Sequence, residues 1–466
     1  MNIIIIGAGR VGESVAESLL SERNDITVVD TDPKRLAMLQ DRLDLRGVPG
    51  NAIQPSVLRE AGAQDCDMLI ACSPLDETNL VVCKVAHDTF NVPTTIARMR
   101  SPEFVNGSAL LGKQGGFGVD HVICPEASLT SYIGKLIEYP EALQVLEFAA
   151  GLLSLIAVRA VAGGPMVQHS LAEIPRLVRG ADMRIVAIYR GTERVAADGT
   201  TRIEPGDEVF VLAATEHIRT VLGALRQMDR PVRRVMIAGG GKVGLRLARE
   251  LKDSHEIKLI ETSRVRCDYL ATQLPSTALI LNGDSTDEEL MEEENVHEMD
   301  LFIALTSDDE DNIMACLLAK RLGARRVITL INRRAYADLV QGTTIDIGIS
   351  PSQTVIGELL AFVRRGDVEA VHSLRRGAAE ALEIVAHGDL KCSKVVGRRI
   401  EQVGLPPGAQ IGAIVRGLGS DGAAPQVLMA HHDSVIEHGD HVIVFLPGKR
   451  LVPEVEKLFQ VSATFF

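Results

Sequence analysis

Large aromatic side chains are scarce in this chain of 466 residues, which has no tryptophan, 5 tyrosines and 11 phenylalanines. Because 46% of the residues are hydrophobic, the core must be built mainly from Val, Ile, Leu and Ala. Such a core suits parallel strands that helices cover on both faces. The length allows about three domains, and the charged fraction of 24% is typical of a soluble globular protein.

Cysteine pairs are also missing. The 7 cysteines include no CxxC motif, their number is odd, and most lie inside apolar runs, as buried structural thiols do. The pattern indicates neither a disulfide framework nor a zinc site, and it fits a reducing compartment.

The sequence has no long apolar run and no signal peptide. No stretch reaches the roughly 18 uncharged apolar residues that a membrane helix needs, since the most apolar one, residues 143–162, contains Glu147 and Arg159. The first residues, MNIIII, lack a basic region and a cleavage site. We therefore expect a cytoplasmic protein that does not span a membrane.

Excess positive charge is absent, because the formal net charge is −13. Nucleic-acid backbones and anionic lipid surfaces attract clustered Lys and Arg, so we expect no nucleic-acid partner. An acidic surface would suit the basic cytoplasmic loops of a membrane protein, although ordinary solubility is the simpler explanation.

What the chain does have is an internal repeat. GAGRVG at residues 7–12 recurs as GGGKVG at residues 239–244, and DHVICP at 120–125 recurs as DIGISP at 346–351. A smaller repeat follows in each half: IVAIYRG at 185–191 matches IGAIVRG at 411–417, and IEPGD at 203–207 matches IEHGD at 436–440.

The repeat predicts four domains in the order large, small, large, small. In the large units, short apolar runs alternate with segments of helical period, which predicts an α/β fold with a Rossmann-like, doubly wound parallel sheet. The small units are expected to be α+β modules, with turns at Pro205-Gly206 and Gly439. The predicted boundaries are 1–130, 141–226, 232–355 and 372–460.

The glycine motif has the context of a dinucleotide-binding loop in both copies. In the first, apolar residues 2–6 lead in and a helical segment, 11–20, leads out. Gly7 allows the tight turn, Gly9 lets a pyrophosphate approach the backbone, and Gly12 lets the helix pack closely on the strand. The free N–H groups at the start of the helix then bind phosphate.

An acidic residue ends the second strand in each copy, Asp30 in the first and Glu261 in the second. A carboxylate there accepts hydrogen bonds from ribose hydroxyls and repels a 2′-phosphate. Asp30, with Asp32 nearby, therefore favours NAD over NADP. The second site stays open, because Arg264 and Arg266 follow Glu261.

Each loop also carries a base, Arg10 or Lys242. A cation at a helix N-terminus opposes the helix dipole by about 0.3–1 kcal/mol, and a bound polyphosphate would offset that cost. An exposed base bent into solvent explains either residue alone nearly as well, but its recurrence favours the functional interpretation.

Further candidates follow later strands, because ligands of open α/β sheets lie at the carboxyl ends of the strands. Ser and Asn at such places are often only helix caps, and Glu77, Asn79, Glu310 and Asn312 can equally be polar residues of a first helical turn. The candidates are Asn51, Ala52, Ser73, Pro74 and Arg98 in the first copy and Asp284 and Thr306 in the second.

Catalysis is not indicated. A dehydrogenase needs a second domain that presents an acid or base to the nicotinamide, and the small units contain no Tyr-x3-Lys dyad, nucleophile elbow or Walker loop. The dense histidine group surrounds a predicted turn without metal-ligand spacing, which favours solvated loop histidines over a metal site; its members are His431, His432, His438 and His441. Two nucleotide folds without a catalytic domain suggest a sensor.

These segments together resemble the TrkA family, the cytoplasmic regulatory subunits of the bacterial Trk potassium uptake system, which are built from two RCK (KTN) modules. The resemblance runs from Met1 to about Gln460 and rests on GAGRVG with VVD, GGGKVG with KLIE, GDSTDEEL, TSDDEDNIMACLLAKRLGA, NRRAYADLVQG, SLRRGAAEALE and VGRRI.

The resemblance implies two RCK N-terminal domains, each followed by an RCK C-terminal domain. It implies a homo-oligomeric ring, expected to be a tetramer, on the cytoplasmic face of the inner membrane beneath a TrkH- or TrkG-type potassium-transporting subunit. It also implies that NAD(H) and ATP or ADP bind in the RCK units, without indicating which nucleotide prefers which site.

By motif, the first site would comprise Gly7, Ala8, Gly9, Arg10, Val11, Asp30, Asn51, Ala52, Ser73, Pro74 and Arg98, and the second Gly239, Gly240, Gly241, Lys242, Val243 and Glu261. When the two copies are aligned, they differ where Gly50-Asn51 corresponds to Gly283-Asp284. They differ again where a constant offset in residue number pairs Arg98 with Ile331. Two alternatives stay open: a soluble NAD-dependent oxidoreductase, and an RCK-type regulator of another cation channel or antiporter.

Overall fold

The computed structural model describes residues 1–22, 24–101, 104, 110–113, 115–228, 230–340, 344–364, 367–375, 378–419 and 424–461. The chain forms two compact units that are not contiguous in sequence. One comprises Met1–Thr130, Leu330–Leu339 and Ile349–Ile356, and the other comprises Ser131–Thr329, Val340–Gly348 and Gly357–Phe466. No helix of the described residues is long and apolar enough to cross a membrane.

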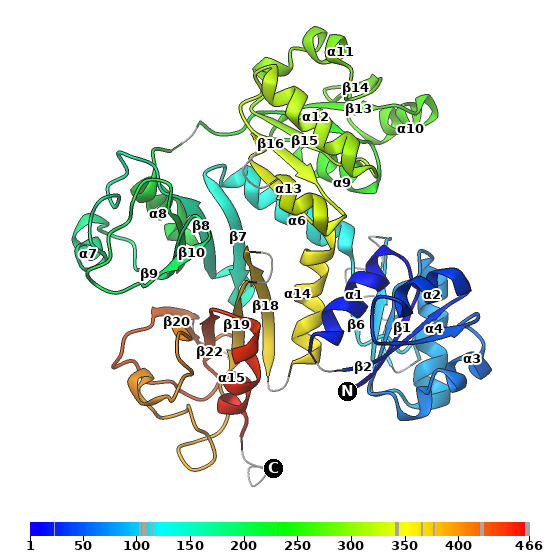
Figure 1. Ribbon diagram of the computed structural model, residues 1–466, viewed down its shortest axis with the longest axis horizontal. Coiled ribbons are helices and arrows are strands. Elements are labelled where there is room, and N and C mark those ends of the chain that lie inside the picture. The colour runs from blue at the N-terminus through cyan, green and yellow to red at the C-terminus, as the bar shows by residue number, and fades with distance from the viewer. Residues whose placement is uncertain are drawn as a thin grey trace. The chain divides into compact units, whose positions relative to one another are not determined.

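Two six-stranded parallel sheets have the same strand order, β3-β2-β1-β4-β5-β6 and β14-β13-β12-β15-β16-β17 (Figure 1). This is the doubly wound order of Rossmann folds, as predicted. The strands of the first sheet are β1 (Asn2–Ile6), β2 (Asp25–Asp30), β3 (Arg46–Pro49), β4 (Met68–Ala71), β5 (Thr94–Arg98) and β6 (His121–Ile123). Those of the second are β12 (Arg234–Ala238), β13 (Glu256–Glu261), β14 (Leu279–Asn282), β15 (Leu301–Ala304), β16 (Val327–Leu330) and β17 (Ile347–Ile349).

Helices alternate with these strands along the chain. The first copy contains α1 (Arg10–Leu20), α2 (Pro33–Gln40), α3 (Pro55–Glu60), α4 (Asp76–Phe90) and α6 (Pro125–Glu138). The second contains α9 (Lys242–Leu251), α10 (Arg264–Gln273), α11 (Glu288–Glu293), α12 (Asp309–Arg321), α13 (Arg334–Val340) and α14 (Pro351–Val363).

Two five-stranded antiparallel sheets form the small domains, in the orders β10-β9-β11-β8-β7 and β18-β19-β22-β20-β21. The first has β7 (Ala142–Phe148), β8 (Leu153–Arg159), β9 (Met183–Arg190), β10 (Glu193–Val195) and β11 (Glu208–Ala214), with α7 (Ile174–Leu177) and α8 (Ile218–Leu225). The second has β18 (Val368–Leu374), β19 (Ala379–Val385), β20 (Gln410–Arg416), β21 (Gln426–Met429) and β22 (His441–Leu446), with α15 (Val452–Phe459).

The core is aliphatic, as the scarcity of aromatic residues predicted. Strand β1 buries four isoleucines, and β4 is buried along its whole length. In the small domains, Phe148 and Phe210 of the first share one buried cluster with Phe445 of the second. The six cysteines from Cys66 to Cys316 are buried, which confirms their structural interpretation.

The smaller sequence repeat forms an equivalent arginine–aspartate ion pair in each small domain. Arg190 donates from Nε and Nη2 to Asp207 at 2.8 and 2.9 Å, and Arg416 makes the same bidentate contact with Asp440 at 2.9 and 2.9 Å. Both aspartates are almost fully buried, and each also accepts the backbone N–H of the glutamate that begins its turn. The repeated motif is therefore a clamp, with a buried carboxylate and a partly exposed arginine, on the turn before β11 or β22 that the turn signals predicted.

A carboxylate connects the two small domains. Glu383 of β19 is 4% exposed; its Oε2 accepts the N–H of Ala149 at 2.8 Å, and its Oε1 lies 2.6 Å from Nδ1 of His441. Ala149 needs this support because it and Ala150 have φ of +50° and +53°, a region that residues other than glycine rarely adopt. His441 is therefore not the solvated loop histidine that the sequence predicted, whereas His431 and His432 are exposed. No group of metal-binding side chains occurs among the described residues.

Replacing Asp207 with Ala should destabilise the first small domain by about 3 kcal/mol, since three hydrogen bonds to a buried carboxylate are lost. Glu204→Ala is the matched control, because Glu204 contacts the same arginine at 3.0 Å but is 54% exposed, and exposed ion pairs contribute at most about 1 kcal/mol. Urea unfolding followed by circular dichroism measures both. Equal stability of the two variants would contradict the clamp.

The His441–Glu383 pair should make stability depend on pH. Its hydrogen bond with Glu383 raises the pKa of His441, so the pair stabilises the fold fully below the unfolded pKa of about 6.5. This contribution is lost as the pH rises through the raised folded pKa. The stability difference between wild type and His441→Gln should be largest near ~pH 6 and shrink at higher pH.

The exposed His432→Gln serves as the control for this titration. Burial lowers the pKa of His372, which gives a pH dependence of opposite sign, but His372 is present in every variant and cancels in the difference. A difference between wild type and His441→Gln that does not change with pH would refute the assignment.

Candidate functional site

The glycine loops have the close backbone packing that the sequence predicted. Gly7 has φ +101° and Gly239 has φ +102°, and a Cβ at Gly12 would lie 1.8 Å from the carbonyl oxygen of Gly7. In the second copy a Cβ at Gly244 would lie 2.0 Å from the carbonyl oxygen of Gly239. The helix can therefore begin directly above the end of the strand only because these positions lack side chains.

The middle glycine of each loop faces open space. A Cβ at Gly9 or Gly241 would meet no atom within 4 Å. Both residues precede a helix, α1 or α9, whose first N–H groups have no partner within the helix. An open approach to these N–H groups is the geometry that a phosphate requires.

The acid at the end of the second strand holds each glycine loop. Asp30 accepts the N–H of Ala8 at 2.6 Å with one oxygen and the N–H of Asp32 at 2.8 Å with the other. Glu261 likewise accepts the N–H groups of Gly240 at 3.0 Å and Ser263 at 2.9 Å. Both carboxylates are half-buried. Each therefore holds the loop backbone and still has part of its surface exposed beside the loop.

The two loop bases occupy equivalent positions, and the second copy has two further arginines nearby. Arg10 and Lys242 are exposed at the first positions of α1 and α9, and Val11 and Val243 follow them half-buried. Arg266 donates from Nε to the carbonyl of Gly240 at 2.7 Å, so it belongs to the second glycine loop. Arg264 pairs with Asp268 on the surface of α10.

Asn51 and Asp284 occupy equivalent turns. Each uses its side-chain oxygen to accept the backbone N–H two residues later, from Ile53 at 3.1 Å or Thr286 at 2.8 Å. Both side chains are exposed, whereas Ala52 is buried. The substitution of Asn for Asp between the copies therefore changes the charge at this place without changing the turn.

A buried asparagine positions the loop after the fourth strand in each copy. Asn79 accepts the N–H of Ser73 at 2.9 Å and donates to the carbonyls of Ser73 and Arg98 at 3.1 and 2.7 Å. Asn312 does the same for Thr306, accepting its N–H at 2.9 Å and donating to its carbonyl at 3.1 Å. Both are 0% exposed. The recurrence of this asparagine in the sequence is the signal for its role. The sequence pattern alone is explained equally well by a polar residue in the first turn of a helix.

Arg98 is half of a buried ion pair. Its Nη2 lies 3.0 Å from Oε1 of Glu126 on α6, which Arg100 also approaches at 3.3 Å. Arg100 donates to the carbonyl of the exposed Pro74 as well. Nothing in the sequence motifs pointed to Glu126, because an ion pair between β5 and α6 depends on their packing.

The offset that paired Arg98 with Ile331 is wrong by one residue. Thr95 and Val327 both donate their N–H to the aspartate before the last strand of their sheets, at 2.8 Å, which aligns Arg98 with Leu330. The lengths of the connecting segments differ between the copies, so a constant offset fails here. The conclusion that the second copy lacks this arginine stands.

Comparison with known proteins agrees with this architecture. The sequence model of the TrkA-N domain family matches residues 3–125 and 235–351, and that of the TrkA-C domain family matches residues 155–226. The chain is 51% identical to the Trk system potassium uptake protein TrkA of Vibrio alginolyticus, and 51% and 46% identical to those of Halomonas elongata and Haemophilus influenzae. Each alignment covers 100% of both chains.

The chain belongs to the TrkA family. Its structure also resembles solved RCK structures, which show the fold at low sequence identity. The GsuK RCK domain matches with a TM-score of 0.60 and 16% identity, over 98% of this chain and 94% of that one. The GsuK channel bound to NAD matches with a TM-score of 0.60 and 18% identity, over 98% and 78%.

Alanine at Gly12 should reduce the stability of the protein far more than alanine at Gly9. Gly12→Ala forces a methyl group into the Gly7 carbonyl and should cost about 3 kcal/mol or prevent folding. Gly9→Ala enters open space at an ordinary φ of −78° and should change stability by about 1 kcal/mol or less. Thermal unfolding of both variants measures this. A Gly12→Ala protein as stable as Gly9→Ala would show that the loop is packed differently.

Proposed function

We propose that this protein regulates potassium uptake by binding nucleotides at its two glycine loops. The observation that carries the proposal is the duplication: two loops with open glycines, acid anchors and phosphate-accessible helix starts occur in one chain of the TrkA family. The full-length relatives are named as potassium uptake proteins of the Trk system, which favours this function over an oxidoreductase or a regulator of another channel.

NAD(H) and ATP or ADP are the proposed ligands. The half-buried carboxylate of Asp30 beside the loop suits ribose hydroxyls and disfavours a 2′-phosphate, which supports NAD at the first site. At the second, Glu261 occupies the same place, but Arg266 holds the loop carbonyl and adds positive charge. We therefore expect the two sites to differ in nucleotide preference.

The partner follows from the same family. We propose a homotetrameric ring on the cytoplasmic face of the inner membrane, in contact with a potassium-transporting subunit of the TrkH or TrkG type. The relatives' membership of a potassium uptake system supports a membrane transporter as partner. The net charge of −13 suits the basic cytoplasmic loops of such a subunit. We also propose the four domain boundaries given by the sequence repeat.

Regulation requires only that a nucleotide bind one shape of the ring better than another, because the population then shifts by that difference in affinity. With several sites per ring, a difference of about 1–2 kcal/mol at each would be enough to move a gate. Asp30 and Glu261 offer a physical link between nucleotide binding and the conformation of the glycine loop, since each carboxylate would contact the ligand and the loop backbone at once.

Asp30→Ala should weaken NADH binding about tenfold or more, because it removes both the ribose contact and the Ala8 anchor. Gly9→Asp should do the same by placing a negative charge beside the pyrophosphate. Isothermal calorimetry measures the affinity, and thermal unfolding shows whether each variant is folded. Asp25→Ala, an exposed aspartate at the other end of β2, is the control. Unchanged NADH affinity in both folded variants would overturn the site.

The function is tested by co-purification with the membrane subunits from the native host, followed by potassium flux with and without ATP and NADH. Nucleotide-dependent flux that Asp30→Ala and Glu261→Ala abolish supports the proposal. Turnover of NADH with a small substrate by the purified protein would favour the oxidoreductase instead.

A further inference from the structure

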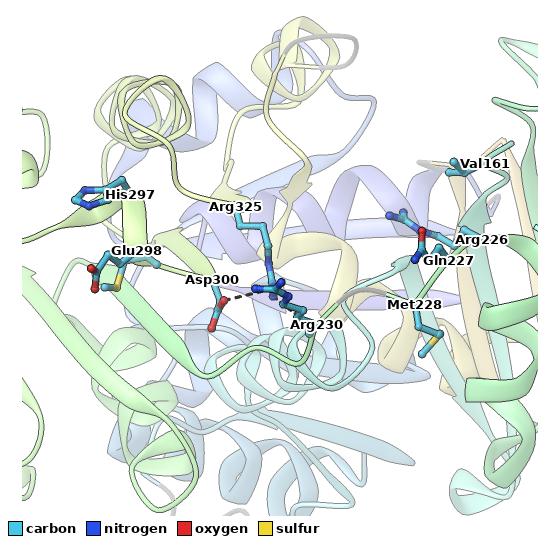
Figure 2. A pocket seen from close by; sticks show the side chains of 10 residues that line it. Val161, Arg226, Gln227, Met228, Arg230, His297, Glu298, Asp300 and Arg325 are labelled. Carbon is cyan, nitrogen blue, oxygen red and sulfur yellow. Dashed lines mark hydrogen bonds and ion pairs between the residues drawn. The ribbon is translucent and has the colours of Figure 1, made fainter. Parts of the chain in front are cut away.

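A cavity of about 600 Å³ lies in the second compact unit, and Figure 2 shows the side chains that line it. Its walls include Asp300, which immediately precedes β15, and Arg325, which lies two residues before β16. The cavity is therefore at the amino-end edge of the second parallel sheet, whereas Gly239 follows the carboxyl end of β12. The five residues of β12 separate these edges by roughly 16 Å.

Three arginines contribute to the walls. Arg226 follows α8 of the first small domain, Arg230 lies in the segment that joins the two halves, and Arg325 comes from the sheet domain. Figure 2 shows Arg230 and Arg325 side by side near the centre of the view, with Arg226 to the right. Guanidinium groups bind phosphate and carboxylate in a bidentate manner.

The described acids of the cavity are already engaged. Glu298 pairs with Arg234 at 2.6 Å. Asp300 accepts the N–H groups of Arg233 at 2.8 Å and Arg234 at 3.0 Å, and it contacts Arg325 at 3.5 Å. These bonds engage both carboxylates, and none of them uses the guanidinium of Arg230, which can therefore donate to a further anion.

Comparison of the two copies shows that the fold does not require an arginine at the position of Arg325. Because Thr95 aligns with Val327, Arg325 stands where the first copy has Pro93. Asp67, in contrast, is the equivalent of Asp300 and makes the same bond to the first strand, accepting the N–H of Asn2 at 2.7 Å. The structural carboxylate is common to both copies, and the arginine is particular to the second.

The cavity also has an apolar side. Val161 is 42% exposed and Met228 is 38% exposed, so both present apolar surface to the cavity that they line. The volume falls within the roughly 300–1,000 Å³ of small-molecule sites. We propose that this cavity binds a small organic anion of about mononucleotide size, with its phosphate or carboxylate on the arginines and its apolar part against Val161 and Met228.

Such a ligand would touch the segment that joins the two halves. Arg226 and Arg230 bracket it, and Arg325 holds it by donating to the carbonyl of Arg230 at 2.9 Å. Occupancy would thereby stiffen the connection between the first small domain and the second sheet, independently of the nucleotide sites.

Calorimetric titration of the full chain with phenyl phosphate and with benzoate tests the site and distinguishes the two acidic groups. We expect a Kd of about 1 mM or tighter for at least one probe, weakened about tenfold by Arg230→Gln. This substitution keeps the backbone carbonyl that Arg325 uses. Arg226→Gln should have a similar effect, and Met228→Ser should weaken binding through the apolar wall.

Arg321→Gln is the matched control, because Arg321 is an exposed arginine of the same sheet domain that pairs with Glu288 outside the cavity. Binding that survives Arg321→Gln and Gly9→Asp but is lost in Arg230→Gln supports the site. No heat of binding from either probe at about ten times the expected Kd, equal affinity in all variants, or loss only in the glycine-loop variant would overturn it.

Discussion

The contact between a helix backbone and the loop that follows the central strand sets the geometry of both candidate nucleotide sites. At Gly12 and Gly244 there is no room for a Cβ, because the carbonyl of the first loop glycine lies within 2.0 Å of where that atom would be. This contact places the start of the helix over the end of the central strand. The open middle glycine of the loop, the carboxylate that accepts a loop N–H (Asp30 or Glu261) and the asparagine that holds the next loop (Asn79 or Asn312) belong to the same end of the sheet.

The two copies share this scaffold and differ in charge around it. Asp30 and Glu261 make equivalent bonds to the loop, and Asn79 and Asn312 hold equivalent turns. Arg98, in contrast, is replaced by Leu330, and Asn51 by Asp284, while Arg266 supports only the second loop. A duplicated fold thus carries two candidate sites with different electrostatics, which is the physical basis for proposing different nucleotide preferences.

The small domains show how a chain with few aromatic residues joins its parts. Phe148, Phe210 and Phe445 meet in a single cluster, and Glu383 bonds across it to the strained turn at Ala149. A buried carboxylate costs free energy unless it is fully bonded, and this one has both an N–H donor and a histidine. The contact of Glu383 with the turn at Ala149 therefore stabilises the two small domains, and loss of either bonding partner of this carboxylate should weaken it.

Sequence by itself determined the duplication, the doubly wound fold and the glycine loops, because these depend on local periodicity and on positions where only glycine fits. It also identified the turns before β11 and β22 through Gly206 and Gly439. Tertiary structure alone decided that Arg98 meets Glu126, that His441 meets Glu383, and that three arginines line one cavity. Those contacts join segments far apart in the chain, and their side chains have no local pattern that would mark them as neighbours.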